Sequence, residues 1–191
     1  MERLMENQVL YINACVREGS RTDRLARRVL EHKVLAKTGG FTELVLAKEN
    51  LLPLDGATLA LREELISKGQ FDHDMFRFAR QFAEAEVIVI GAPFWDLSFP
   101  ALLKTYLEQI YIVGLVTRFD ETGRQMGLCK AKKLYYVTTA GGPYTRTYSY
   151  DYVRELVGAF GIAETELVYA ENLDIVGNDP DAILDAVVLP D

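Results

Sequence analysis

Apolar residues along the chain gather into short runs with two different spacings. Five of these runs are typical of strands, and they cover residues 9–16, 41–48, 86–91, 133–138 and 166–170. The run over residues 9–16 is nearly continuous, which is typical of a strand buried on both faces of a parallel sheet, and the run over residues 86–91 is also that of a buried strand. We therefore predict five strands.

Between the strands, apolar residues recur at the period of a helix that packs on one face. The first predicted helix begins at Asp23 and ends at Gly39-Gly40, which provides a C-terminal cap. Further helices are predicted over residues 57–68, 74–84, 100–113, 150–160 and 181–187. Pro100 falls in the first turn of its helix, and the Asp-Glu-Thr-Gly turn within residues 117–128 predicts a hairpin.

Strands that alternate with helices predict an α/β fold. Right-handed crossovers make it a doubly wound five-stranded parallel sheet in the order 2-1-3-4-5, with helices on both faces. The length of 191 residues fits one domain over residues 1–191. In this order the loops after the first, third and fourth strands emerge at one carboxyl edge, which is where small-molecule sites form.

The first of these loops has the chemistry of a phosphate site. Gly19-Ser20-Arg21-Thr22 stands at a helix N-terminus and offers free N–H groups, hydroxyls and a guanidinium. The alternative is that Ser20 or Thr22 only caps the helix. Because the loop has neither Gly-x-x-x-x-Gly-Lys-Ser/Thr nor Gly-x-Gly-x-x-Gly, a mononucleotide is favoured over a nucleoside triphosphate or a tightly held dinucleotide.

The other two loops suit a flat ligand. Residues 93–97, Pro-Phe-Trp-Asp-Leu, present aromatic faces and main-chain groups to a planar heterocycle, although ordinary aromatic packing is the alternative. Residues 139–142, Thr-Ala-Gly-Gly, allow close backbone approach because glycine has no Cβ, although the pair could form only a turn.

Charge and composition exclude several classes of function. Lys and Arg number 21 against 28 Asp and Glu, and the net charge of −7 disfavours binding to nucleic acid or anionic lipid. Apolar runs stay well short of the roughly 20 residues that cross a membrane. The first residues show no signal-peptide pattern and Cys15 and Cys129 suggest no disulfide framework or zinc site, so we expect a cytoplasmic protein without a metal.

Longer stretches carry a family resemblance over nearly the whole chain. They are residues 92–97, 100–108 (Pro-Ala-Leu-Leu-Lys-Thr-Tyr-Leu-Glu), 127–133 and 139–142. On these residues the sequence resembles the FMN-dependent NADH azoreductases and the related NAD(P)H quinone dehydrogenases, which have a flavodoxin-like fold. Against the azoreductase pattern, the first loop is one residue shorter and holds Arg21 where a neutral amide is expected, and a guanidinium strengthens phosphate binding.

The resemblance implies an FMN site built from the three loops. The residues implied for the FMN phosphate are Ser20, Arg21 and Thr22, with Cys15 close by at the end of the first strand. The residues implied for the isoalloxazine ring and the ribityl chain are Pro93, Phe94, Trp95, Asp96 and Leu97. The residues implied for the pyrimidine end, with main-chain donors facing the ring, are Thr139, Ala140, Gly141 and Gly142.

The resemblance also implies an activity, in which NAD(P)H passes a hydride through bound FMN to a quinone or azo compound by a ping-pong mechanism. Tyr144 is the candidate proton donor, with simple packing as its alternative, and neither His32 nor His73 is expected to be catalytic. A homodimer is implied, with residues 102–113 and 117–128 as its surface. The alternatives are a flavodoxin-type electron carrier, an NAD(P)H-dependent FMN reductase and a non-catalytic module that binds a partner through the 102–113 helix.

Overall fold

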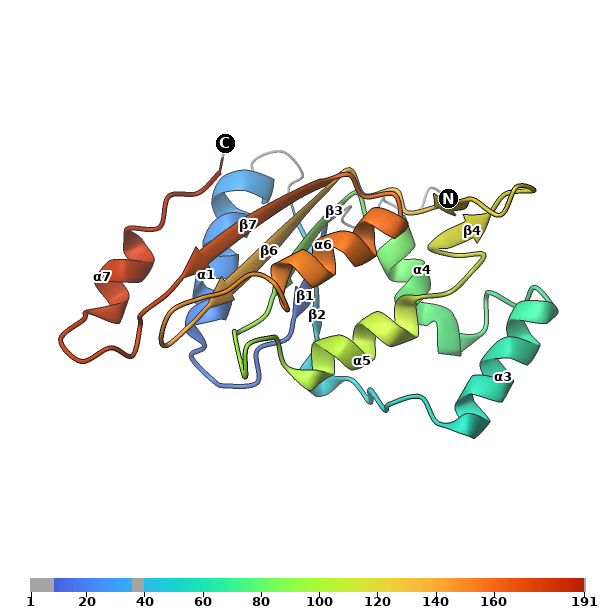
Figure 1. Cartoon of the computed structure of the whole chain (residues 1–191), viewed down its shortest axis with the longest axis horizontal. Helices are drawn as coiled ribbons and strands as arrows, with labels where there is room; N and C mark the ends of the chain where they lie inside the picture. Colours follow the sequence, from blue (N-terminus) through green and yellow to red (C-terminus); the bar gives the residue numbers. More distant parts are fainter. Residues whose placement is uncertain (1–8, 36–39, 191) are drawn as a thin grey trace.

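A five-stranded parallel sheet forms the centre of the structure, a computed structural model that describes residues 9–35 and 40–190 (Figure 1). The strands are β1 (Val9–Asn13), β2 (Thr42–Val45), β3 (Val87–Gly91), β6 (Lys133–Thr139) and β7 (Glu164–Ala170). Their order is β2-β1-β3-β6-β7, and every neighbouring pair is parallel. The predicted order 2-1-3-4-5 is therefore confirmed.

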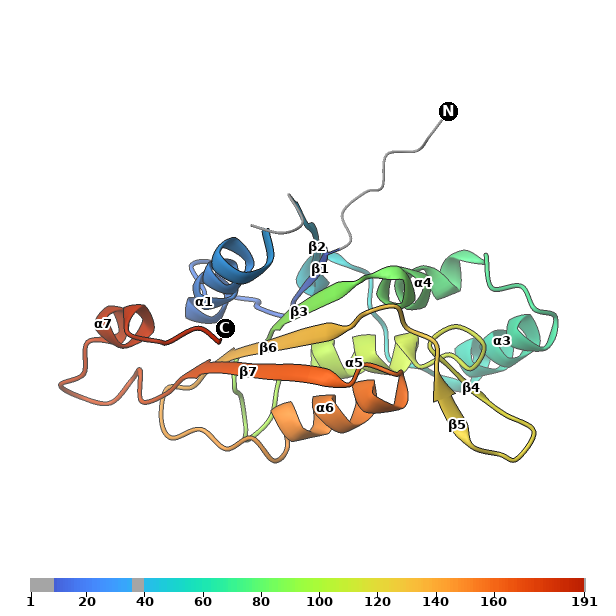
Figure 2. The ribbon, with the colours of Figure 1, turned by 90° about the horizontal axis from the view of Figure 1, so that it is seen from above.

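Helices cover the two faces of this sheet (Figure 2). Helix α1 (Arg21–Val29) and helix α7 (Pro180–Asp185) pack on one face, where Leu25 and Leu184 belong to the same buried cluster as Val89 of β3. Helices α4 (Arg77–Glu84), α5 (Ala101–Ile110) and α6 (Tyr150–Ala159) pack on the other. The central strands are buried because both of their faces are covered, which explains the continuous apolar runs of the sequence.

Helix α3 (Gly56–Ser67) is the exception, because it projects away from the sheet (Figure 1). Leu65 is its one buried side chain, whereas Leu59 and Leu61 are exposed. The predicted helix over residues 57–68 is thus confirmed within one residue, but of its apolar positions only Leu65 and Ile66 join the core that the structure describes.

Several predicted boundaries were wrong, and each has a local cause. The first helix begins at Arg21, and its α-helical part gives way to a π-helical turn, η1 (Leu30–Leu35), while Gly39 of the predicted cap lies outside the described residues. The first strand ends at Asn13, because its side-chain Oδ1 accepts a hydrogen bond from Cys15 N and turns the chain. The second strand gives way to a 3₁₀ turn, η2 (Leu46–Lys48).

The same holds further along the chain. A 3₁₀ turn, η3 (Asp74–Phe76), precedes α4 within the predicted helix over 74–84. Pro100 is the N-cap of α5 rather than part of its first turn, and α5 stops at Ile110 because Tyr111 leaves the helical conformation. Strand β7 begins two residues early, at Glu164, where it pairs with Lys133 at the start of β6.

The predicted hairpin is confirmed as the antiparallel pair β4 (Thr117–Phe119) and β5 (Gln125–Gly127). Its turn is closed by Asp120, whose Oδ1 accepts from the amides of Thr122 and Arg124. The hairpin then crosses the end of α6 with main chain against main chain, because a Cβ on Gly127 would lie 2.1 Å from the nitrogen of Gly161. In the part of the chain that the structure describes, no helix is long and apolar enough to cross a membrane.

Candidate functional site

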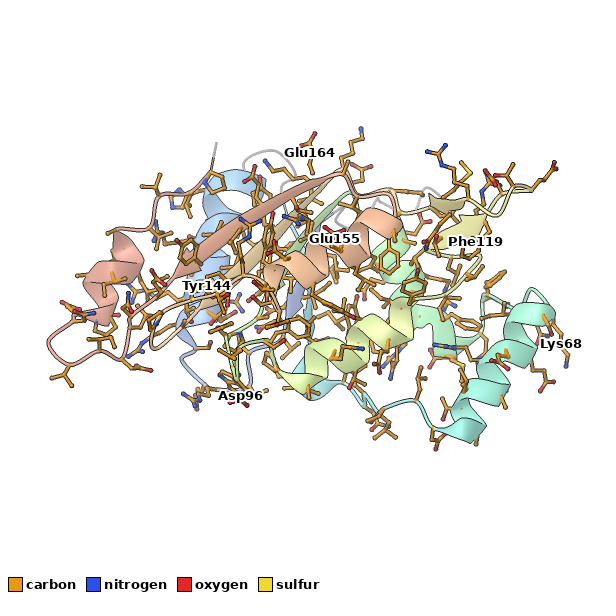
Figure 3. All side chains as sticks on the ribbon, viewed as in Figure 1. Lys68, Asp96, Phe119, Tyr144, Glu155 and Glu164 are labelled. Carbon is orange, nitrogen blue, oxygen red and sulfur yellow. The ribbon has the colours of Figure 1, made fainter. Side chains whose placement is uncertain are left out.

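The three predicted loops meet around a cleft of about 390 Å³ at the carboxyl edge of the sheet. Residues 20–22, 93–95 and 139–141 line it, so nine of the predicted binding residues come together. Its volume falls within the roughly 300–1,000 Å³ of small-molecule sites. Figure 3 shows Asp96 and Tyr144 at this end of the molecule, away from Lys68 and Phe119.

The first loop presents unpaired amides to the cleft. Ser20 caps α1, with its Oγ accepting from Asp23 N at 3.4 Å, so the capping alternative holds for Ser20. Among the described residues, however, no acceptor meets the amides of Gly19, Ser20, Arg21 or Thr22. Gly19 has a φ of +66°, which favours glycine over residues with a Cβ. Free N–H groups at a helix N-terminus favour an anion.

Two arginines add positive charge at this end. Arg21 Nη1 donates to Asp174 Oδ1 at 2.7 Å, and the guanidinium of Arg17 lies 5.6 Å from the ring centroid of Trp95. Glu18 and Asp174 line the same cleft and balance them. The anion site is therefore made chiefly of main-chain donors, with the arginines at its rim.

A hydroxyl pair ties the first loop to the third. The Oγ1 atoms of Thr22 and Thr139 lie 2.6 Å apart, and both side chains are buried. The carbonyl of Thr139 accepts from Phe94 N at 3.0 Å, which adds the second loop to the same tie. Because the Thr22 hydroxyl is shared with Thr139, the contribution of Thr22 to an anion comes chiefly from its amide.

A polar network fastens the start of α1 to the sheet. Asp23 Oδ1 accepts from Tyr11 OH at 2.8 Å and from Asn13 Nδ2 at 3.0 Å, and its Oδ2 accepts from Arg27 Nε at 2.9 Å. Arg27 and Asn13 also donate to Glu43 on β2. Hydrogen bonding to Asp23 raises the pKa of Arg27. These bonds fix the direction in which the first amides of α1 point.

The second loop folds back on itself in a tight turn. Trp95 and Ser98 exchange both main-chain hydrogen bonds, at 3.0 and 2.8 Å. The two residues between them have positive φ, 49° for Asp96 and 67° for Leu97, a conformation that side chains with a Cβ rarely adopt. The turn carries Phe94 and Trp95 into the cleft, but Asp96 and Leu97 lie at its tip and do not line the cleft.

The third loop offers fewer donors than its sequence suggests. The amide of Ala140 is used by the carbonyl of Ala170, whereas those of Gly141 and Gly142 meet no acceptor among the described residues. A Cβ on Gly141 would lie 2.3 Å from Asp174 Oδ2, so the side chain that approaches this glycine closely is that of Asp174. Gly142 faces open space and does not line the cleft.

Cys15 stands behind the cleft rather than in it. Its thiol is buried, with Sγ 3.7 Å from the carbonyl of Gly91, and burial raises the pKa of the thiol to about 11. The residue is a protonated core side chain at neutral pH. Cys129, also free, has its pKa raised by burial to about 12.

Tyr144 lies next to the cleft and contacts its aromatic wall. Its ring meets the ring of Phe94 edge-on at 5.0 Å and that of Tyr169 at 5.1 Å. Its phenol oxygen lies 2.9 Å from Ser149 Oγ, and burial raises the pKa of the phenol. The role of Tyr144 as a proton donor stays a prediction.

The histidines do not line the cleft either. His32 is exposed on the π-helical turn after α1, and the Nδ1 atom of His73 accepts from Met75 N at the start of η3. Both lie outside the set of residues that line the cleft.

Asp174 and Leu173 are cleft residues that the sequence analysis missed. They follow β7, and the carboxyl end of that strand reaches the same edge as the other three. A fourth loop at this edge was the signal available, because every parallel strand of such a sheet ends there. The loop has neither a glycine pair nor an aromatic run in its first residues to single it out.

The chain is similar in sequence to a family of known proteins over nearly its whole length. A family model described as flavodoxin-like fold matches residues 7–188. The "FMN-dependent NADH:quinone oxidoreductase 2" of Clostridium acetobutylicum is 36% identical over 187 residues, 93% of this chain and 92% of the relative. The "FMN-dependent NADH:quinone oxidoreductase" of Clostridium beijerinckii is 36% identical over 188 residues, 95% of this chain and 94% of the relative.

Solved structures agree on the fold. An azoreductase from Bacillus anthracis superposes with a TM-score of 0.79 at 24% identity, over 93% of each chain. An FMN-dependent NADH-azoreductase from the same species, in complex with FMN, superposes with a TM-score of 0.77 at 24% identity, over 94% of this chain and 92% of that one. The chain therefore belongs to the flavodoxin-like fold family, within which its relatives of similar length are FMN-dependent NADH:quinone oxidoreductases.

Proposed function

We propose that this protein is an FMN-dependent oxidoreductase that passes electrons from a reduced nicotinamide to a quinone or an azo compound. The observation that carries the proposal is the cleft, which combines unpaired amides of residues 19–22 with an aromatic wall at Phe94 and Trp95. The names of the relatives specify NADH, FMN and quinone, and those of the structural neighbours specify azoreductase. Fold, cleft chemistry and relatives thus support the same activity.

The residues present fit FMN. A phosphate monoester matches the amides and guanidinium of residues 20–22, and the planar ring system matches the faces of Phe94 and Trp95. The free amide of Gly141, which lines the cleft, matches the carbonyl-bearing edge of the ring. When bound, FMN accepts a hydride from the nicotinamide and returns two electrons to the acceptor.

The chain's own part in this reaction is to bind and orient. The hydroxyl tie between Thr22 and Thr139 holds the phosphate end and the ring end at a fixed separation. The amide of Gly141 would offer a hydrogen-bond donor to negative charge at the edge of a bound flavin ring. Four other residues predicted to bind FMN do not line the cleft and carry no part of this proposal: Cys15, Asp96, Leu97 and Gly142.

The absorbance spectrum of the purified protein tests the proposal. A flavin spectrum that NADH bleaches without oxygen and that a quinone restores is the expected result. A flavin bleached only by dithionite would indicate an electron carrier. Flavin that leaves the protein on gel filtration once reduced would indicate an FMN reductase, and a colourless protein without NAD(P)H oxidation would indicate a non-catalytic module.

The proposal includes a homodimer. The apolar face of α5 is used in the core, so the 102–113 stripe leaves little for a subunit contact. Exposed apolar side chains remain on the hairpin, at Phe119 and Met126, and on α3, at Leu59 and Leu61. Light scattering at micromolar concentration is expected to give twice the chain mass of 21.5 kDa, and a monomer would contradict the dimer.

We also place the protein in the cytoplasm and treat residues 1–191 as one domain. Two free cysteines support the first point, because disulfides are rare in a reducing compartment. The second is supported by the cleft, whose walls come from both halves of the chain.

A further inference from the structure

Asp174 brings a carboxylate to the arginine that faces the phosphate end of the cleft. Its Oδ1 lies 2.7 Å from Arg21 Nη1, and both side chains line the cleft. The Asp174 side chain is 69% exposed and that of Arg21 40%, so the pair opens to the space that a ligand would enter. The guanidinium suited to a phosphate therefore already has an anionic partner within the chain.

The position of Asp174 is fixed by the main chain. Its amide donates to the carbonyl of Gly141 at 2.8 Å, and the amide of Leu173 donates to Ala140 at 3.2 Å. The amide of Asn172 donates to Gly142 at 3.0 Å. The carboxylate lies against Gly141, where a Cβ would come within 2.3 Å of Oδ2 in its present position. Asp174 is thus a fixed part of the cleft wall, and its side chain alone is free to turn.

The side chains that line the cleft carry no net charge, so the ion pair between Arg21 and Asp174 affects how strongly the cleft attracts a phosphate. The cationic lining residues are Arg17 and Arg21, and the anionic ones are Glu18 and Asp174, so the side-chain charges cancel. A phosphate monoester carries about −1.5 to −2 at pH 7 and is repelled by a carboxylate on the same guanidinium.

We propose that Asp174 is a specificity-determining residue, which competes with the ligand's phosphate for Arg21 and thereby weakens the binding of FMN relative to riboflavin, the same ring without phosphate. This inference rests on the proposed function, because it assumes that the cleft takes FMN. If Asp174 instead served to orient Arg21 toward the phosphate, removing its charge would weaken FMN binding. The two roles predict opposite signs.

The same helix and the same C-terminal segment provide a matched control. Arg24, one turn along α1, bonds to Asp181 and Asp185. None of these three residues lines the cleft. Asp181→Asn removes one negative charge from the segment, as Asp174→Asn does, while Asp185 still pairs with Arg24.

The experiment is titration of the flavin-free full chain with FMN and with riboflavin, followed by the quenching of flavin fluorescence. Asp174→Asn is expected to tighten FMN binding about tenfold, the effect of removing one unit charge near the phosphate in a partly solvated cleft. Riboflavin binding is expected to change less than about twofold, or to be absent from both proteins. Asp181→Asn is expected to leave both affinities unchanged.

The other outcomes overturn the inference. Weaker or unchanged FMN binding in Asp174→Asn would show that the carboxylate does not compete, and an equal gain for riboflavin would show that it acts on the ring or on access. The same gain in Asp181→Asn would assign the effect to general charge. Failure of the proposed function has a different signature, because the unsubstituted protein would then bind neither flavin.

Discussion

The hydrogen bond between the hydroxyls of Thr22 and Thr139 joins the first loop to the third, and its contribution to stability can be measured by substitution. The two side chains are 1% and 8% exposed, and their Oγ1 atoms lie 2.6 Å apart. Thr139→Val keeps the branched shape, removes one hydroxyl and leaves the other buried without its partner. Such an orphaned group costs about 1–3 kcal/mol, so we expect the free energy of unfolding to fall by about 2 kcal/mol.

The double variant Thr22→Val, Thr139→Val gives the opposite expectation. With both hydroxyls replaced by methyl groups, neither partner is orphaned, and the loss should be below about 1 kcal/mol. The double variant would then be more stable than Thr139→Val alone. This sign distinguishes a true pair from two independent hydroxyls, whose losses would add.

Urea denaturation of the flavin-free protein is the assay. Circular dichroism reports the whole fold, and the fluorescence of Trp95, the one tryptophan in the chain, reports the cleft. Coincident transitions would justify a two-state free energy. The melting temperature should fall by about 2–4 °C for each kcal/mol lost. A loss below about 0.5 kcal/mol in Thr139→Val, or additive losses in the double variant, would refute the reasoning.

The remaining predictions concern three substitutions and the two cysteines. Gly127→Ala should lower the free energy of unfolding by more than about 3 kcal/mol, because the new Cβ would lie 2.1 Å from main-chain atoms. Gly158→Ala, in open space on α6, should raise it by about 1 kcal/mol. Thermal unfolding of both variants measures the difference. Tyr144→Phe should lower quinone turnover at least about tenfold if the phenol donates a proton, and unchanged steady-state turnover removes it from the mechanism. Cys15 and Cys129, with pKa values raised to about 11 and about 12, should react slowly with a thiol reagent at pH 8. The pKa of each thiol is higher in the folded protein than the value of 9.0 in the unfolded chain. The contribution of these thiols to the free energy of unfolding is therefore complete below pH 9 and is lost as the pH rises through about 11 for Cys15 and about 12 for Cys129. Denaturation at pH 8 and at pH 10 measures this loss.

The sheet and its site loops could be predicted because their signals are local. Continuous apolar runs mark strands covered on both faces, and the order of strands and helices then brings three loops to one edge. The nine cleft residues that were predicted all lie at the end of a strand, in the loop that follows it, or at the start of a helix.

What could not be predicted depends on contacts between distant residues. Asn13 ends β1 through a bond to Cys15, and it also joins Asp23 and Glu43, a network that no short sequence window contains. Asp174 reaches Arg21 across 153 positions. The left-handed backbone at residues 96–97 could not be predicted either. Positive φ usually occurs at glycine or asparagine, and Leu97 is neither.

The backbone conformation of Leu97 has a cost in stability. A branched side chain held at a φ of 67° costs about 1–2 kcal/mol, and at 60% exposure it recovers little by burial. We expect Leu97→Gly to raise the melting temperature by about 1–3 °C, after the greater chain entropy of glycine is subtracted. Leu97 therefore has a cost in stability that its packing within the chain does not recover. Thermostability screens of this protein would therefore select against that leucine, and the variants they return would have a less strained turn at residues 96–97.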